Sequence, residues 1–375
     1  MRWIDTCASW HPWAGFKSEF LYIDLPMPRN VRTIRPTLMS VALAAEVDVS
    51  TVSRVLSGDT SQRVSEETRE RILACAKQLD YQPNMTARSL RVARTFSLGI
   101  AVPQLDNPVF SQMIIGAERA ARAYGYSLLI AHIEEGGGDI DAYARLASTN
   151  RVDGLLVTTL DDNSVVLKAA KQAKVPVLML NRKVYGVRNS IRFDAAGAAH
   201  IAMNHLIGLG HRRIAHLSGQ LNPSTGLGRF SGYREALLKA GLEVDPSLVA
   251  VSGYTIKGGA DAMREILLRP GPRPTAVFPL TLLAATGAMM TLHEHGIRVP
   301  QDMSVVTVHD GPIAEAMFPP LTTVRMPVEQ MGFDGVVGLI QLIRGERKTV
   351  DSMLAPIELV VRGSTARVDN AALNE

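Results

Sequence analysis

Between Pro36 and Leu79 the apolar residues recur every three or four positions, which is the spacing of amphipathic helices. The pattern stops at residues 46–48 and starts again with Val52, Val55 and Leu56 on one face of a second short run. A third run begins after Ser65 and keeps helical spacing to Leu79. Helices this short are not stable alone in water, so they must pack against each other. The pattern therefore predicts a small domain of three helices.

The second of these helices has a polar face made of Ser50, Thr51, Ser53 and Arg54. Hydroxyl and guanidinium groups form hydrogen bonds with base edges and with phosphates. A short turn followed by such a helix is typical of a helix-turn-helix, in which the second helix enters a major groove of DNA. The alternative interpretation is an ordinary corner of two helices in an enzyme.

From Ser97 onward the pattern changes to short apolar runs that alternate with helical segments. Runs of this kind are typical of a parallel sheet that is covered by helices on both faces. The expected strands are residues 97–102, 127–131, 153–157, 176–180, 213–217, 248–251, 276–278, 304–308 and 357–361. The expected helices are residues 108–124, 140–149, 164–173, 195–209, 229–240, 260–268, 282–295 and 327–343. Because the pattern starts again at residue 195, we expect two α/β lobes with a cleft at the carboxyl ends of the strands.

One segment, residues 274–292, has no charged residue and is long enough to cross a membrane. Pro279 lies inside it, and threonine occurs four times. We therefore expect a buried strand followed by a buried helix, and no membrane partner.

The net charge of +4 is concentrated near the N-terminus. Residues 29–94 contain eleven Arg or Lys and seven Asp or Glu, an excess that equals that of the whole chain. Such a surplus suits phosphate neutralisation, although a solvated basic face has the same composition. The two cysteines are too few for a disulfide scaffold, which is consistent with a reducing cytoplasm.

Residues 1–35 contain all three tryptophans, without periodicity and without the features of a secretory signal. We expect a flexible extension, or sequence upstream of a true start such as Met27. A tryptophan-rich tail that binds a partner is the alternative.

Three motifs between residues 51 and 90 resemble the LacI/GalR family of bacterial transcription regulators. They are Thr51-Val52-Ser53-Arg54-Val55-Leu56, Val64-Ser65-x-x-Thr68-Arg69 and Tyr81-x-Pro83-Asn84-x-x-Ala87-Arg88-x-Leu90. Later segments that match the family are Asp194-x-x-Gly197, residues 210–214 and residues 319–324. The resemblance implies a multidomain chain, in which an all-α helix-turn-helix headpiece and a hinge helix precede a two-lobed α/β effector domain like the periplasmic binding proteins.

The resemblance also implies the domain limits. They are a flexible extension at residues 1–35, a helix-turn-helix domain at 36–82, a hinge helix at 83–95, an effector and dimerisation domain at 96–365 and a tail at 366–375. The first lobe is expected to comprise residues 96–193 and a late crossover segment. The second is expected to comprise residues 194–320 and C-terminal elements.

In the family, a few residues of the recognition helix and of the hinge contact DNA. The resemblance assigns this role to Val49, Ser50, Thr51, Ser53, Arg54, Asn84, Ala87, Arg88 and Leu90. Leu90 is the expected wedge in the minor groove, and a plain linker is the alternative for the hinge. Where the family usually has Gly at the turn, this chain has Glu46; either Glu46 accepts the turn geometry or the turn differs. Asp48 remains able to cap the second helix.

The family binds its effector between the lobes, and the resemblance carries five positions over to this chain. They are Phe110, Asp161, Arg229, Thr281 and His309, and a structural role is the alternative for Phe110, Asp161 and Arg229. His309 stands where the family commonly has an aspartate that accepts sugar hydroxyls. We therefore expect a sugar acid or another carboxylate to suit Arg229 and a partly protonated His309 better than a neutral sugar.

Enzyme signatures are weak. Gly226-x-Gly228-x-x-x-Gly232 has the wrong spacing for dinucleotide binding, and His293 and His295 point to different faces of one helix. We expect no cofactor, no metal and no catalytic residue. The predicted function is a cytoplasmic, homodimeric repressor that binds a near-palindromic DNA operator and responds to a small-molecule effector. The rivals are a solute-binding protein of a transport system and a sugar-modifying enzyme. Induction or corepression, and dimer or tetramer, stay open.

Overall fold

The computed structural model divides the chain into two compact units, before and after the bond between Asn84 and Met85. We call the first unit the headpiece and the second the body. The described residues are 36–57, 64–81, 94–132, 151–158, 175–183, 186–219 and 224–368. Each unit has its own hydrophobic core, so each is considered separately.

The described part of the headpiece forms three helices, α1 (Leu38–Ala45), α2 (Val49–Ser57) and α3 (Glu66–Gln78). Ser65 caps α3, since its hydroxyl accepts a hydrogen bond from the backbone N–H of Thr68 at 3.3 Å. One apolar stripe from each helix forms the core. Its buried members are Val41, Ala42, Ala45, Val52, Val55, Ile72 and Ala76. The predicted three-helix domain is confirmed.

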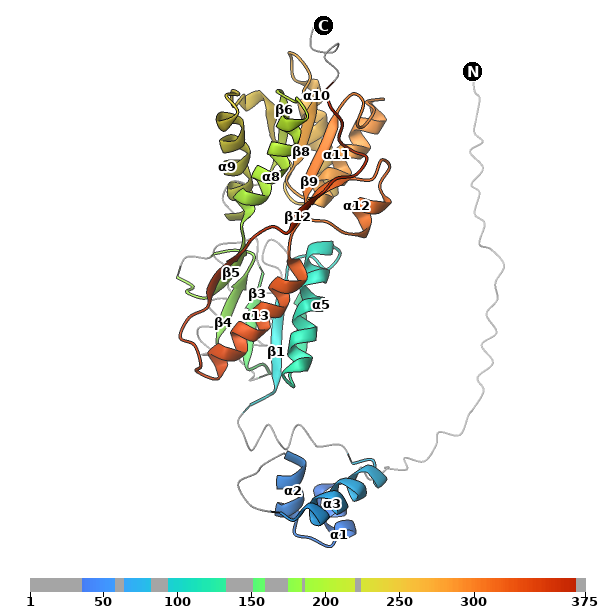
Figure 1. Cartoon of the computed structure of the whole chain (residues 1–375), viewed down its shortest axis with the longest axis vertical. Helices are drawn as coiled ribbons and strands as arrows, with labels where there is room; N and C mark the ends of the chain where they lie inside the picture. Colours follow the sequence, from blue (N-terminus) through green and yellow to red (C-terminus); the bar gives the residue numbers. More distant parts are fainter. Residues whose placement is uncertain are drawn as a thin grey trace, which may run out of the picture. The chain divides into compact units, whose positions relative to one another are not determined.

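The first lobe of the body is built on a six-stranded, all-parallel sheet in the order β11-β5-β4-β3-β1-β2, of which β1, β3, β4 and β5 are labelled in Figure 1. Its strands are β1 (Ser97–Val102), β2 (Ser127–His132), β3 (Gly154–Val157), β4 (Val177–Leu180), β5 (Ser190–Phe193) and β11 (Asp351–Leu354). Two helices, α5 (Pro108–Ala123) and α13 (Val328–Ile343), lie side by side and cover one face of this sheet. Every residue of β3 is buried, as expected for an inner strand of a covered sheet.

The second lobe has a six-stranded sheet in the order β12-β10-β9-β8-β6-β7, in which only the β10–β12 pair is antiparallel. Its strands are β6 (Ile214–Ser218), β7 (Val249–Val251), β8 (Ala276–Pro279), β9 (Ser304–Val308), β10 (Thr322–Arg325) and β12 (Glu358–Val360). Its helices are α8 (Ala195–Gly208), α9 (Ser224–Lys239), the 3-10 turn η1 (Pro246–Leu248), α10 (Ile256–Leu268), α11 (Leu282–Glu294) and α12 (Pro312–Ala316).

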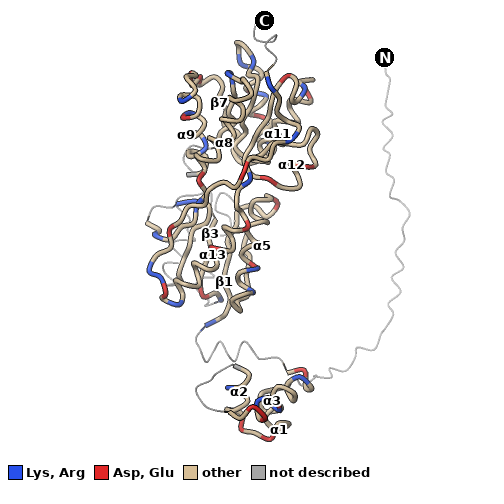
Figure 2. The backbone as a smooth tube through the Cα atoms, viewed as in Figure 1, with Lys and Arg blue, Asp and Glu red and all other residues tan. Residues whose placement is uncertain are grey.

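Strand β8 shows why the second sheet is covered on both faces. Ala276 and Phe278 belong to the core cluster that includes α8 and α9, whereas Val277 belongs to the cluster formed by α10 and α11. Alternate residues of a strand point to opposite faces, so one apolar strand supplies both cores. Strands β6, β8 and β9 carry no Asp, Glu, Lys or Arg, whereas the inner strand β10 ends with Arg325. Most of the other charges of this lobe lie on helices and loops (Figure 2).

The chain crosses between the lobes three times. It passes from β5 to α8 at Asp194, from β10 to α13 at residues 326–327, and from β11 to β12 at residues 355–357. Asp194 begins α8 by accepting a hydrogen bond from the backbone N–H of Gly197 at 2.8 Å. Four elements next to these crossings, β5, β10, β11 and α12, were not among the elements expected from the sequence.

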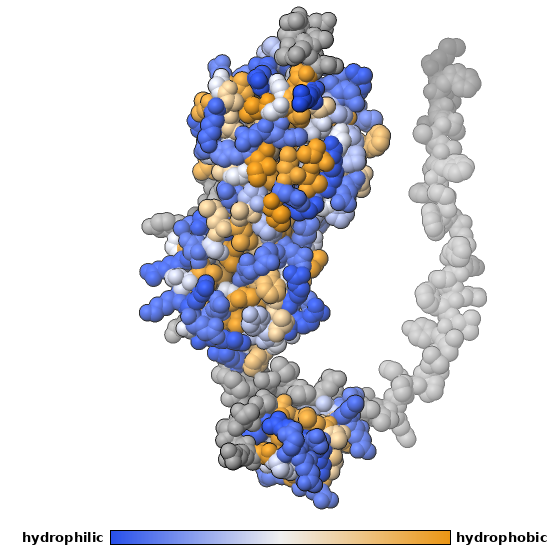
Figure 3. All heavy atoms as spheres, viewed as in Figure 1, coloured by the Kyte–Doolittle hydropathy of each residue, from blue (hydrophilic) through white to orange (hydrophobic). Residues whose placement is uncertain are grey.

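Residues 274–292 form the buried strand β8 and most of α11, as the sequence predicts. Among the described residues, no helix is long and apolar enough to span a bilayer. The face of the body seen in Figure 3 is mainly hydrophilic, with apolar side chains gathered on the second lobe.

Helices α5 and α13 approach closely because each places a glycine against the backbone of the other. A Cβ atom on Gly332 would lie 1.9 Å from the carbonyl oxygen of Met113, and one on Gly116 would lie 1.8 Å from that of Glu329. Neither backbone atom can move without shifting a whole helix. The pair therefore fixes how α13, the element that returns from the second lobe, sits on the first.

We expect Gly332→Ala to lower the free energy of unfolding of the body by about 3 kcal/mol, because the added methyl group separates the two helices. The measurement is a urea unfolding curve followed by circular dichroism. Gly208→Ala is the matched control, since a Cβ atom there meets no atom within 4 Å. That variant should be stabilised by roughly 0.5–1 kcal/mol. Equal midpoints for the two variants would contradict the packing described.

Candidate nucleic-acid interface and ligand pocket

The turn before α2 is held by two acidic residues. Glu46 ends α1 in the left-handed conformation, with φ 53° and ψ 45°. Asp48 begins α2, because its carboxylate accepts a hydrogen bond from the backbone N–H of Ser50 at 2.7 Å. The hydrogen bonds from the side chain and backbone of Ser50 lower the pKa of Asp48. Both expectations for this turn, that Asp48 caps α2 and that Glu46 adopts the turn geometry, are confirmed.

Helix α2 buries Val52 and Val55 and leaves its polar face at the surface of the headpiece. On that face the Arg54 guanidinium donates to the Ser50 hydroxyl at 2.8 Å and to the Ser50 carbonyl at 3.1 Å. Val49, Thr51 and Ser53 are half-buried on the same helix. The face therefore presents hydroxyl groups and a positioned arginine, which are the groups that contact base edges and phosphates.

Five of the predicted site residues cannot be placed. Asn84, Ala87, Arg88, Leu90 and Asp161 lie outside the described residues. Their roles stay predictions.

A pocket lies at the carboxyl ends of strands from both lobes, where ligands of such sheets bind. It is lined by Gln104, Asn107, Val109, Phe110, Thr158, Leu180, Asn181, Arg182, Thr225, Arg229, Tyr254, Thr281 and His309. The four described effector residues predicted from the sequence, Phe110, Arg229, Thr281 and His309, are all in this set. The remaining lining residues were not predicted. Several of the polar ones directly follow a strand, and this position in the sequence could have identified them.

Two of the predicted residues also have structural roles. Thr281 caps α11, since its hydroxyl accepts a hydrogen bond from the backbone N–H of Ala284 at 3.2 Å. Phe110 is only 7% exposed and belongs to the core of the body. Both residues therefore line the pocket and also have a structural role.

Arg229 is the most deeply buried charge of the pocket, with 1% of its surface exposed. Its guanidinium donates to the carbonyl oxygen of Leu280 and to Nε2 of His309, both at 2.8 Å. Burial lowers the pKa of Arg229 to about 10, so the side chain stays charged at neutral pH. Its Nε atom is buried and has no hydrogen-bond partner among the described residues.

His309 is neutral in this pocket. Burial and the nearby Arg229 both lower the pKa of His309 well below its usual value. Because Nε2 accepts a hydrogen bond from Arg229, the proton must be on Nδ1, which is buried and unpaired among the described residues. The expectation of a partly protonated His309 is therefore wrong: a second positive charge beside a buried guanidinium is too costly.

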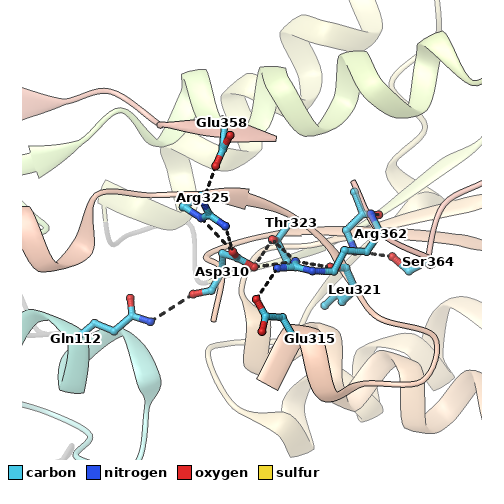
Figure 4. A network of polar contacts seen from close by, with 10 residues as sticks. Gln112, Asp310, Glu315, Leu321, Thr323, Arg325, Glu358, Arg362 and Ser364 are labelled. Carbon is cyan, nitrogen blue, oxygen red and sulfur yellow. Dashed lines mark hydrogen bonds and ion pairs between the residues drawn. The ribbon is translucent and has the colours of Figure 1, made fainter. Parts of the chain in front are cut away.

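The residue after His309 is the centre of an ion-pair network (Figure 4). The Asp310 carboxylate pairs with Arg362 at 2.8 Å and with Arg325 at 2.9 Å, and it accepts a hydrogen bond from Thr323 at 2.8 Å. Burial would raise the pKa of Asp310, but the hydrogen bonds from Arg362, Thr323 and Arg325 lower it to about 2. Its side chain is only 6% exposed and that of Arg362 13%, so the centre of the network is shielded, whereas Arg325, at 42%, lies nearer to the surface.

The same network reaches the crossings and the first lobe. Arg325, the last residue of β10, also pairs with Glu358 of β12, so two of the three crossing segments are tied together. Gln112 of α5 donates to the backbone carbonyl of Asp310 at 3.4 Å, which links the first lobe to the second. His309 thus faces the pocket, whereas Asp310 faces the segments that cross between the lobes.

Comparison with known proteins supports both halves of this description. Residues 37–84 match the family model "Bacterial regulatory proteins, lacI family". Residues 95–362 match the model "Periplasmic binding proteins and sugar binding domain of LacI family".

Individual relatives agree with the two models. The transcriptional regulator CelR of Thermobifida fusca is 34% identical over 341 residues, which cover 89% of this chain and 99% of CelR. A solved complex of CelR with cellobiose matches with a TM-score of 0.68 at 34% identity, over 88% of this chain and all of that one. The lac repressor dimer bound to operator and an anti-inducer matches with a TM-score of 0.75 at 30% identity, over 88% of this chain and 99% of that one.

Glu46 gives the first prediction for the site. A residue with a side chain costs about 1 kcal/mol more than glycine in the left-handed conformation. Glu46→Gly should therefore raise the free energy of local opening of the headpiece by about that amount, measured by amide hydrogen exchange of α1 and α2 in the whole protein. Glu46→Ala removes the same charge but keeps a Cβ atom, so it should bring no gain. An equal increase in the free energy of local opening for Glu46→Ala would contradict the view that the left-handed backbone at residue 46 is strained.

Asp310 gives the second prediction. Because its folded-state pKa is lowered from 3.8 to about 2, its contribution is present above pH 4 and is lost as the pH falls towards 2. The loss should be on the order of 2 kcal/mol in the free energy of unfolding of the body. Asp310→Asn should be less stable than the wild type at pH 7, and the difference should shrink towards pH 2 in urea unfolding curves. A difference independent of pH would contradict the ion-pair interpretation.

Proposed function

This chain belongs to the LacI family of bacterial regulatory proteins, and from that membership we propose how its headpiece and its pocket share the work. The protein is a DNA-binding transcriptional regulator and not an enzyme. We propose that α2 reads the operator, that the pocket binds the effector, and that the protein acts as a repressor in the cytoplasm, where operator DNA is found. The rival function, a solute-binding protein of a transport system, is overturned by the match of residues 37–84 to the regulator model.

The observation that carries the DNA-binding half of the proposal is the polar face of α2 at the surface of the headpiece. Its turn is capped by Asp48 and its inner face is buried, so Val49, Ser50, Thr51, Ser53 and Arg54 have a fixed scaffold. Such a helix places its first residues against base edges in the major groove. Asn84, Ala87, Arg88 and Leu90 are proposed as the hinge contacts, with Leu90 in the minor groove.

The proposed assembly is a homodimer. A two-fold dimer requires a near-palindromic operator, since each headpiece reads one half-site. The related lac repressor structure is a dimer bound to operator. The body here leaves large apolar side chains exposed, among them Ile115 at 57% and Val251 at 62%, which offer surface for pairing.

The effector half rests on the pocket at the carboxyl ends of the strands. Phe110, Arg229, Thr281 and His309 are proposed as ligand contacts, with Asp161 as a further one. The related CelR was solved with cellobiose. For this chain we propose a small polar metabolite of the sugar or sugar-acid type. It shifts operator affinity only by binding one arrangement of the lobes better than the other.

The DNA assignment is tested with the full-length protein and an operator selected from randomised duplexes. Ser50→Ala removes an exposed hydroxyl from α2 and releases Arg54, so it should weaken specific binding by about tenfold, as loss of about 1.4 kcal/mol implies. Binding to random DNA, which depends on phosphate contacts, should change little. Ser111→Ala removes a surface hydroxyl from α5 and should leave operator binding unchanged. A wild type that selects no sequence over random DNA would overturn the function.

A further inference from the structure

We propose that the effector carries an oxyanion, a carboxylate or a phosphate, which sits against Arg229 and the Nδ1–H group of His309. This inference rests on the proposed function of the pocket as the effector site. It adds the chemical class of the ligand, and it assigns to residue 309 the choice between anionic and neutral ligands.

The first observation is that Arg229 is a buried cation without an acidic neighbour among the described residues. Among the described residues, both of its hydrogen bonds go to neutral acceptors, the Leu280 carbonyl and the His309 ring. A buried charge is stable only when it is paired, because transfer out of water costs several kcal/mol per ion. The described residues supply no counter-charge to Arg229, and a ligand can supply one.

Other shielded arginines of the body are paired differently. Arg362, whose side chain is 13% exposed, contacts the carboxylates of Asp310 and Glu315. Arg213, which is more exposed, contacts Asp245 at 3.2 Å. Both of these arginines are therefore paired with carboxylates of the chain itself. Arg229 is more buried than either, and no acid of the described part of the chain pairs with it.

The second observation concerns the remaining lining. It contains a further arginine, Arg182, but no aspartate or glutamate among the described residues. Several polar side chains are already engaged: the Asn107 amide with Gln104 and the backbone of Val109, and the Thr158 hydroxyl with the Ala101 carbonyl. A neutral sugar needs strong acceptors for its hydroxyl groups, and this lining offers few.

The third observation is which polar atoms are left over. Four buried atoms of the lining have no hydrogen-bond partner among the described residues. They are Arg229 Nε, His309 Nδ1, the Tyr254 hydroxyl and Asn181 Oδ1. The first two are obligate donors in the tautomer set by Arg229, the Tyr254 hydroxyl can donate, and only the Asn181 atom is an obligate acceptor. A group with several acceptor oxygens and a negative charge satisfies these donors best.

Residue 309 decides this balance. A carboxylate there would neutralise Arg229 from within the protein and accept hydroxyl groups. The neutral imidazole instead leaves the positive charge of Arg229 unpaired by residue 309, so that an anionic ligand can pair with it. His309 adopts a left-handed backbone conformation with φ 76°, which asparagine and aspartate tolerate well. His309→Asn and His309→Asp are therefore a matched pair that differs in charge and hardly in shape.

The test measures thermal unfolding of the full-length protein in sodium phosphate, sodium acetate, sodium chloride and glucose, the salts at equal ionic strength. We expect phosphate or acetate to raise the unfolding midpoint of the wild type by about 3 °C over chloride. His309→Asn loses the imidazole donor but keeps Arg229 without an acid at residue 309, so its midpoint should also rise, by a smaller amount. His309→Asp should not respond, because its own carboxylate occupies Arg229. General salt effects act equally on all three proteins. The same rise in all three, or in none, overturns the proposal.

A second arm uses the wild type alone and separates this inference from the function beneath it. Operator complexes are challenged with glucose, gluconate, glucuronate and glucose 6-phosphate in a gel-shift assay. A change of operator affinity of tenfold or more with an acid or phosphate, and not with glucose, supports the proposal and shows which oxyanion is preferred. A response to glucose alone overturns the oxyanion but keeps the effector function. Failure to bind any operator overturns the function, while the unfolding test still decides whether an oxyanion binds.

Discussion

The buried carboxylate of Asp310 is the interaction on which the arrangement of the body depends. It pairs with Arg325 at the end of β10 and with Arg362 after β12, and Arg325 in turn pairs with Glu358. These residues belong to, or adjoin, two of the three segments that cross between the lobes. The pairing of the Asp310 carboxylate with both guanidinium groups holds the loop after β9 in one position. Removing the carboxylate would leave the two guanidinium groups without their shared partner.

That loop also carries His309, so the residue that lines the pocket directly precedes the residue that holds the crossing segments. The left-handed φ of 76° at His309 turns the chain so that the imidazole faces Arg229 while the next side chain faces Arg325. A ligand that moves Arg229 or His309 must therefore act on the loop that holds the crossings. Coupling between sites needs two arrangements with different ligand affinity, and this loop is where the two would differ.

Much of the fold could be predicted from the sequence. The apolar positions of α2, such as Val52 and Val55, have clear helical spacing, and the inner strands are continuous apolar runs. The turn was predictable as well, since Asp48 is a standard capping residue and Glu46 stands where the chain must turn. The strands β5, β10 and β11 were missed for a physical reason. Residues such as Asp351 and Arg325 serve ion pairs at crossings, so these strands lack a continuous apolar run.

The site was predicted in part. Phe110, Arg229, Thr281 and His309 do come together, but the neutral state of His309 was not foreseen, because protonation depends on burial that a sequence does not reveal. Asn181 and Tyr254 carry no motif, and only the end of a strand brings them to the pocket. The contacts of Asp310 join residues more than ten positions apart, which no local pattern encodes.

The central claim is that pocket and headpiece share one conformational equilibrium. The most direct measurement is the affinity of the full-length protein for a metabolite that shifts operator binding, by calorimetry with and without saturating operator DNA. Thermodynamic linkage requires the operator to change the metabolite's affinity by the same factor by which the metabolite changes the operator's. We predict equal factors of about 5 to 150. The same metabolite affinity with and without operator would contradict the account.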